Sequence, residues 1–429
     1  MNIFLIIGFF LLKTATIMAS DEIPVNQESS EFLSTQSASK LEINGSLDTK
    51  YLLLYSRKTS SLYNLQNFGQ AKKSNDLSQF VLEPYLNGDY VTKDLGFHFK
   101  THGTYINEQA SNLDLFELYG TINARPTLTF SVGKKAYNWG KGYAFNPVGY
   151  VNPIKDSENP ELLQAGLMSL AVDYTKSFDS DALRTLGLTF LMIPSSKIQN
   201  KYGEVSQTDF AAKAYFLAWD MDIDILGYKS LSNGNQLGLD FSKNILTNIE
   251  MHGEFSRFEN VPKASIIQNT LNIRNGTGNS YLAGMRYLNS IETTVIAEYY
   301  HNGNGLSSDE FKQYIKYNND TITSGQSASV QQALGTSTTY FQKSAIMRDY
   351  LYLKISQAEP FNWVYFTPST FVLYNLNDQS FALGVPLSYK PFTNFELLAW
   401  PTFLVGSLGT QFGEKPFSHR METWLRFYF

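Results

Sequence analysis

The sequence predicts an all-β protein, a transmembrane antiparallel up-and-down β-barrel of about 18 strands. Three observations carry this prediction. The 429 residues are 15% aromatic but only 17% charged, against about 25% charged in soluble domains. Apolar and polar residues alternate in one segment after another, as they do when one strand face meets lipid and the other meets water. Past residue 13, no stretch approaches the ~18 uncharged apolar residues that a membrane helix needs.

The start of the chain predicts export. Ile3–Leu12 is an apolar run of secretory length, followed by Lys13 and small residues, so residues 1–20 are expected to be a signal peptide. Residues 21–39 show no hydrophobic period and are expected to form a flexible periplasmic leader. The sequence contains no cysteine, which excludes disulfide scaffolds and thiol chemistry.

The remaining residues, 40–429, carry the alternating pattern expected of the barrel. Leu41 and Ile43 alternate with Glu42 and Asn44, for example. Predicted strands begin near residues 40, 79, 95, 114, 127, 164, 184, 207, 221, 236, 247, 280, 291, 347, 362, 379, 394 and 419. Several contain a proline, which strand pairing disfavours, so a count of 16 strands stays open. These prolines are Pro84, Pro368, Pro386 and Pro401.

The predicted connections sort into two sets. Every second one is short and rich in turn residues, as the periplasmic turns of an outer-membrane barrel are. These turns are Thr92–Asp94, Arg125–Thr127, Phe178–Asp181, Asp220–Asp222, Leu246–Asn248, Asn289–Ser290, Ala358–Asn362 and Pro391–Asn394. The long connections all belong to the other set and are expected to be extracellular loops. They are 56–78, 138–163, 196–206, 259–279, 304–346 and 406–418.

The end of the chain resembles a known class of proteins. In the last nine residues Met421, Thr423 and Leu425 alternate with polar and aromatic residues, and the chain ends in Phe429. This segment resembles the closing strand of bacterial outer-membrane proteins. The resemblance implies a bacterial outer-membrane location, with lipid and lipopolysaccharide around the barrel, and recognition by the barrel-assembly machinery.

A second, narrower resemblance lies at residues 133–153. Gly133-Lys-Lys-Ala-Tyr-Asn-Trp-Gly140 is followed by Asn146-Pro147 and Asn152-Pro153. The segment looks like one found in several poorly characterised porin-like barrels, in which a basic pair at a strand end leads to Trp-Gly and Asn-Pro turns. Those families commonly have Arg in the basic pair, whereas this chain has Lys134 and Lys135. The resemblance implies porin-like passage of solutes.

Catalysis and metal binding have weaker support. Glu250, His252 and Glu254 project from one strand face, and residues at i and i+2 can converge on a metal, but a charged lumen is built from such residues as well. With five histidines and no G-x-S-x-G motif, no nucleophile and base stand out. We therefore expect no catalytic residues, no metal site and no cofactor, and we do not expect an enzyme.

Alternation assigns charged side chains to the lumen. Basic ones lie on early strands and acidic ones on strands 10–13, elsewhere on the wall, so we hypothesise a transverse field that favours small polar solutes. An undirected scatter of wall charges is the competing interpretation. The expected pore-lining residues are His98, Lys100, His102, Glu117, Lys135, Lys213, Asp240, Glu250, His252, Glu254, Glu298 and Arg348.

Two long loops are candidates for narrowing the bore. Ser307-Ser-Asp-Glu310 resembles a helix capping box, and Phe311 and Tyr314 follow at helical spacing. The 138–163 loop is aromatic and contains three prolines, so it is a plausible plug or solute contact. The expected constriction residues are Trp139, Tyr143, Asp156, Glu158, Phe311 and Tyr314.

The functional expectation is a porin-like outer-membrane channel. Small polar solutes would diffuse passively through a charged lumen narrowed by inward loops, since about 16–18 strands enclose an aqueous lumen. A substrate-selective channel is the alternative within transport. A non-conducting barrel that binds surface polysaccharide or partners a periplasmic complex is the alternative outside it. Assembly into a homo-oligomer stays open, and the net charge of −5 gives no reason to expect nucleic acid.

Overall fold

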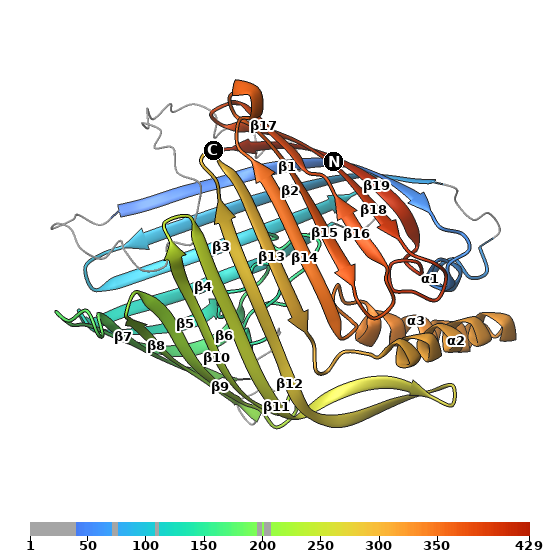
Figure 1. Ribbon diagram of the computed structural model, residues 1–429, viewed down its shortest axis with the longest axis horizontal. Coiled ribbons are helices and arrows are strands. Elements are labelled where there is room, and N and C mark those ends of the chain that lie inside the picture. The colour runs from blue at the N-terminus through green and yellow to red at the C-terminus, as the bar shows by residue number, and fades with distance from the viewer. Residues whose placement is uncertain (1–39, 71–75, 108–110, 195–199, 201–206) are drawn as a thin grey trace, which may run out of the picture. The chain divides into compact units, whose positions relative to one another are not determined.

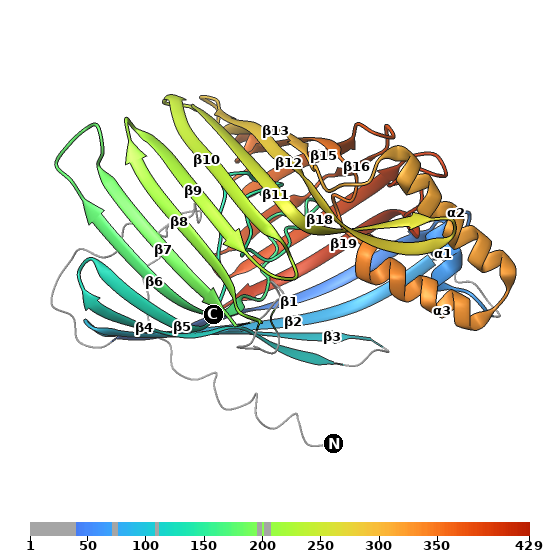
Figure 2. The same ribbon diagram turned by 90° about the horizontal axis from the view of Figure 1, so that it is seen from below.

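The structure is a computed structural model that describes residues 40–70, 76–107, 111–194, 200 and 207–429. Its strands form one antiparallel sheet, drawn in Figures 1 and 2. The sheet is closed, because β1 (Lys40–Ser56) pairs with both β2 (Asp76–Val91) and β19 (Phe417–Tyr428). The predicted signal peptide and leader, residues 1–39, lie outside the described residues.

The other strands follow one another around the wall in chain order. They are β3 (Leu95–Ile106), β4 (Asn112–Arg125), β5 (Leu128–Lys135), β6 (Leu167–Ser177), β7 (Thr185–Ile193), β8 (Asp209–Ala218), β9 (Met221–Lys229), β10 (Asn235–Leu246), β11 (Ile249–Ile267), β12 (Thr270–Leu288), β13 (Thr293–His301), β14 (Asp349–Gln357), β15 (Phe366–Asn375), β16 (Phe381–Gly384), β17 (Leu387–Phe392) and β18 (Phe395–Val405).

The described part of the wall has 18 strands. Of its 19 segments, β16 and β17 are two pieces of one strand, because both pair with β15 and β18. Val385 and Pro386 separate the pieces, and a proline has no N–H to give to a neighbouring strand. The predicted all-β up-and-down barrel of about 18 strands is confirmed, and the alternative count of 16 is wrong.

The two faces of the wall differ in the way that the alternation predicts. On β11, Met251 and Phe255 point outward and are each 46% exposed, whereas the inward His252 and Glu254 are 5% and 3% exposed. The same exposed apolar outer face continues around the other strands. Leu47, Phe97, Phe130, Leu170, Phe190, Phe210, Ile225, Leu239, Leu351 and Leu425 belong to it. A soluble protein would cover such a surface, whereas a transmembrane barrel presents such a surface to lipid.

The connections at one end of the wall are short. They comprise residues 92–94, 126–127, 178–184, 219–220, 247–248, 289–292, 358–365 and 393–394. The connections at the other end include the long ones, 57–75, 136–166 and 302–348. We call these the short-turn end and the long-loop end.

The segment 259–279 differs from the expected loop. It consists of continuations of β11 and β12, which meet in a hairpin turn at Gln268 and Asn269, both with positive φ (49° and 60°). Ile266 is 1% exposed within the apolar cluster at the long-loop end. The hairpin is therefore stabilised by burying one of its faces against that cluster. The segment is rich in Asn and Gly, which are typical of loops, and for this reason the sequence predicted a loop instead of two paired strands.

Helices lie at the long-loop end (Figure 1). They are α1 (Ser61–Gln66), α2 (Ser308–Ser324), α3 (Ser327–Thr336) and the π-helical turn η3 (Ser337–Phe341), while a 3-10 turn, η4 (Pro360–Asn362), belongs to the short-turn end. The capping box expected at Ser307 and Glu310 is present: the Glu310 N–H donates to the Ser307 side chain, and the Ser307 N–H donates to Glu310. None of the described helices is long and apolar enough to span a membrane.

Candidate functional site: a loop inside the barrel

The connection between β5 and β6, residues 136–166, lies inside the barrel, and we call it the inner loop. Its apolar side chains are almost fully buried: Trp139, Phe145 and Tyr150 are each 3% exposed, and Val148 is 0% exposed. Trp139, Val148 and Tyr150 pack with inward residues of β6–β9. Phe145 packs with Tyr300, Tyr350 and Tyr352 on β13 and β14. The inner loop therefore contacts the wall on two sides.

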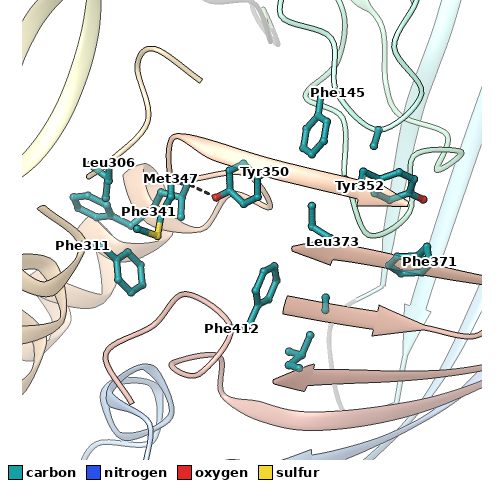
Figure 3. Close-up of a cluster of buried hydrophobic side chains, with 14 of the residues drawn as sticks. Phe145, Leu306, Phe311, Phe341, Met347, Tyr350, Tyr352, Phe371, Leu373 and Phe412 are labelled. Atoms are coloured by element: carbon teal, nitrogen blue, oxygen red, sulfur yellow. Dashed lines mark hydrogen bonds between the residues drawn. The ribbon is translucent and has the colours of Figure 1, made fainter. Parts of the chain in front are cut away.

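Figure 3 shows the second of these contacts. Phe145 lies beside Tyr350 and Tyr352, and the same cluster continues to Phe311 and Phe341 of the helical region. The inward side chains of β14, β15 and β18 that line this cluster are thus largely apolar. The expected pore-lining residues are all charged residues or histidines, so the inward Tyr350 and Tyr352 were not among them.

Glu254 of β11 binds the inner loop through its carboxylate. Oε1 accepts hydrogen bonds from the backbone N–H groups of Lys141 and Gly142, both at 2.7 Å, and Oε2 accepts one from Val148 at 3.2 Å. The side chain of Asn146 donates to Oε1 at 3.2 Å. A carboxylate that accepts several N–H groups is strongly held, since charge-assisted hydrogen bonds are about twice as strong as neutral ones.

Glu298 of β13 binds the next residues of the loop. It accepts hydrogen bonds from the backbone N–H groups of Tyr143 and Ala144, the latter at 2.9 Å. His252 approaches the same carboxylate, with Nε2 3.0 Å from Oε1. Residues 141–148 are therefore wrapped around two buried wall carboxylates, which we call the carboxylate seat.

An ion pair adds to the carboxylate seat. The Lys141 ammonium lies 2.9 Å from Asp224 and 3.8 Å from Asp240, on β9 and β10. Asp224 is 1% exposed and Asp240 0%. Truncating one partner of such a buried pair usually costs about 3–5 kcal/mol, because the other charge is left uncompensated.

The later part of the inner loop reaches β14 and β19. Glu158 lies 3.4 Å from Arg420, and Glu161 lies 3.0 Å from Lys354. Asp156 turns back to accept the Glu158 N–H at 3.0 Å. Burial, reinforced by the charge of Glu158, raises the pKa of Asp156 above its usual range.

Most of the acidic residues expected to line the lumen contact the inner loop instead of open solvent. Asp240, Glu254, Glu298 and His252 face inward as predicted, but the inner loop covers them, so they do not form an open acidic wall. Glu250 accepts a hydrogen bond from Ser242 at 3.0 Å and is only partly covered. Within the described residues, no group of three or more His, Asp or Glu side chains is arranged to hold a metal ion.

The expected residues on β3 and β4 form a paired cluster. Lys100 lies 3.2 Å from Glu117, and His98 lies 2.6 Å from Asp89. His102 stacks on Tyr85, with ring centroids 4.4 Å apart. These side chains keep part of their surface open, because Lys100 is 20% and His98 18% exposed.

Four other expected residues have different surroundings. Lys213 lies over the ring of Trp139 at 5.8 Å, and Lys135 lies over Tyr119 at 5.4 Å, both in the geometry of cation–π contacts. Tyr143 donates to Glu161 at 2.6 Å. Arg348 precedes β14 and lies 3.9 Å from Glu310 of α2, so the structure places it among the helices rather than along the strands.

Phe311 and Tyr314 are also placed differently from the expectation. They are 3% and 1% exposed on the buried face of α2, where Tyr314 stacks on Phe341 at 4.2 Å. Their spacing predicted the helix correctly. The same spacing serves packing at the long-loop end instead of contact with a solute, because a large apolar cluster lies beneath the helix.

Sequence reasoning missed the residues that build the carboxylate seat from the loop side. Gly140 has φ of 96°, and Gly142 approaches the Phe145 carbonyl so closely that a Cβ would lie 2.0 Å from it. Asn146 entered only as part of the Asn-Pro resemblance, without a site role, and Asp224 of the β9 wall was not singled out. The Trp-Gly and Asn-Pro resemblance marked this segment, but nothing local in the sequence points to a partner on β11.

Gly140→Ala is expected to loosen the carboxylate seat. At φ of 96° a side chain is strained, and a Cβ would lie 2.7 Å from both the Asn146 amide and Glu254 Oε1. The inner loop should then become sensitive to an added protease in vesicle-reconstituted protein, while the barrel stays folded. Gly335→Ala is the matched control, because a Cβ there meets nothing within 4 Å. Equal protease resistance of both variants would contradict the prediction.

No protein-family model and no curated protein matches the chain. Solved structures similar in fold include an engineered variant of Rhodopseudomonas blastica porin, with a TM-score of 0.44 and 12% identity over 91% of this chain and 100% of that one. Another variant of the same porin has a TM-score of 0.45 and 11% identity over the same shares. A structure described as "Asymmetric conductivity of engineered proteins" has a TM-score of 0.43 and 12% identity, again over the same shares.

Proposed function

We propose that the protein is a porin-like channel of the bacterial outer membrane, through which small polar solutes diffuse passively. One observation carries the proposal: a closed wall of 18 strands is apolar outside and keeps a partly open charged face inside, on β1–β4 and β19. Barrels of about 16–18 strands are wide enough for an aqueous lumen. The apolar outer face suits membrane lipid and lipopolysaccharide.

The open charged face is a set of ion pairs of both signs. Arg426 pairs with Asp48 at 2.8 Å and with Glu396 at 3.2 Å, and Lys100 pairs with Glu117. Paired charges attract water and polar groups without favouring one ion strongly. Weak ion preference follows from this arrangement, and apolar solutes are disfavoured.

The inner loop supports a narrow bore instead of a wide one. It packs on β6–β9 at one side and on β13–β14 at the other, and its Glu158 reaches Arg420 of β19. The proposed path for solute therefore runs beside the charged face of β1–β4. This same packing favours a second function, a non-conducting barrel that binds surface polysaccharide or partners a periplasmic complex.

Single-channel conductance in a planar bilayer tests the proposal. We expect steady open steps, with a reversal potential close to zero in a salt gradient. Silence from a barrel that is demonstrably folded would favour the non-conducting alternative. Deleting residues 305–345 would then separate a channel closed by the helices from a barrel filled by its inner loop.

Reversing Lys100 and Lys135 to Glu measures how strongly this face selects ions. Lys100 is paired, whereas Lys135 contacts aromatic rings, so the double variant adds negative charge to the lumen at two places. The reversal potential should shift toward cation preference. An unchanged reversal potential would show that this part of the wall does not face the path of the ions. Lys312→Glu, on the exposed face of α2, is the control.

A further inference from the structure

Two buried carboxylates of the barrel wall face each other across neighbouring strands. Asp224 of β9 and Asp240 of β10 are direct register partners, and Asp240 is in turn opposite Glu254 of β11. The exposed fractions of the three are 1%, 0% and 3%. Three carboxylates thus lie side by side with almost no exposed surface.

The hydrogen bonds in this row are unevenly distributed. Glu254 accepts four from the inner loop. By contrast, both carboxylate oxygens of Asp240 and Oδ1 of Asp224 have no hydrogen-bond partner among the described residues. An ionised carboxylate oxygen buried in this way is costly, because it loses hydration and gains no hydrogen bond in return.

The charges around Asp224 and Asp240 do not offset the cost of burying two ionised carboxylates. Lys141 of the inner loop is 2.9 Å from Asp224 and 3.8 Å from Asp240. Four other titratable groups face the pair: Tyr215 of β8, Asp222 of β9, Glu254 of β11 and Tyr150 of the inner loop. Tyr215 donates a hydrogen bond to Asp222, and Tyr150 donates one to Ser256 at 2.9 Å. One ammonium therefore faces several carboxylates.

We propose that Asp224 and Asp240 form a proton-binding site that holds one proton at neutral pH. The proton comes from the solvent and forms an O–H bond on Asp240, which donates a hydrogen bond to the Asp224 carboxylate. Asp224 stays ionised and pairs with Lys141. With the proton bound, the pair carries one negative charge beside the Lys141 ammonium, and one of the two orphaned oxygens of Asp240 gains a partner. The site would hold this proton whether or not the barrel conducts.

Asp240→Asn tests the proposal through the pH dependence of stability. In the unfolded chain an aspartate releases its proton near pH 3.9, so above about pH 5 the folded wild-type barrel would hold one proton more than its unfolded chain. Stability then falls as pH rises, and the unfolding equilibrium constant increases about tenfold per pH unit for one proton. The amide introduced by Asp240→Asn has no proton to release in this range, so the variant lacks this dependence.

The measurement is urea unfolding of both proteins in lipid vesicles between about pH 5 and pH 7. We expect the ratio of wild-type to variant unfolding constants to rise about tenfold per pH unit. A ratio that stays constant with pH would overturn the proposal. A ratio that depends on sodium concentration instead of pH would also overturn it, by showing a cation in place of the proton. Asp173→Asn is the control, because this inward aspartate already accepts a hydrogen bond from Thr189 at 2.6 Å.

A second measurement keeps the proposal open to test if Asp240→Asn does not fold. The infrared spectrum of the wild-type barrel at pH 7 should contain a carbonyl band of a protonated carboxyl group, and Asp224→Asn should remove it, since Asp240 would then ionise and pair with Lys141. A wild-type spectrum without this band would contradict the proposal. Its persistence in Asp224→Asn would contradict it equally.

Discussion

Replacing Glu254 with Ala is expected to raise single-channel conductance severalfold by releasing the inner loop. The carboxylate accepts three backbone N–H groups and one side-chain amide of that loop while only 3% exposed. Each buried donor left without a partner costs about 1–3 kcal/mol. The loop should therefore leave its seat, and the bore should widen where the loop now packs against β13 and β14.

Glu250→Ala is the matched control. Glu250 is on the same strand and the same face, but it accepts a hydrogen bond from Ser242 alone among the described interactions. Its conductance should stay at the wild-type level. Glu254→Gln should raise the conductance in part, because its amide NH₂ would point a donor at N–H groups of the inner loop that now donate to the carboxylate. Equal conductance of the Glu254→Ala and Glu250→Ala variants, both folded, would show that the carboxylate seat does not limit the bore.

Replacing Arg426 with Met is expected to destabilise the barrel at the point where its first and last strands meet. Arg426 and Asp48 are register partners across the β1–β19 pair. Nε and Nη2 of Arg426 donate to the two oxygens of Asp48 at 2.9 and 2.8 Å. Asp48 is 1% exposed, so the variant leaves a buried charge with nothing to balance it, at a cost of about 3–5 kcal/mol.

Urea unfolding in lipid vesicles measures this effect, with the shift of electrophoretic mobility on heating as a simpler check of folding. Arg286→Met is the control, because Arg286 is an exposed arginine on the inner face of β12. Asp48→Asn combined with Arg426→Met should recover part of the lost stability, since the buried residue 48 then carries no charge. A single variant as stable as wild type would show that strand pairing alone closes the barrel.

The strands and their order are predictable because they depend on local pattern. Alternation along each strand identifies which residues face outward, so Met251 and Phe255 can be assigned to the outer face without knowledge of any pairing. The Ser307 and Glu310 capping box predicted the start of α2, because it needs only four consecutive residues. The interrupted strand at Pro386 also follows from a local property, the missing N–H.

The sequence by itself thus determined the barrel class, the alternation of short and long connections and the inward side of each strand. The tertiary structure alone decided which inward residues stay open. Glu254 meets the N–H of Lys141, which lies 113 residues earlier, and Arg426 meets Asp48, 378 residues away. No period in the chain encodes such contacts, because they arise when a closed wall brings distant strands and the inner loop into the same small volume.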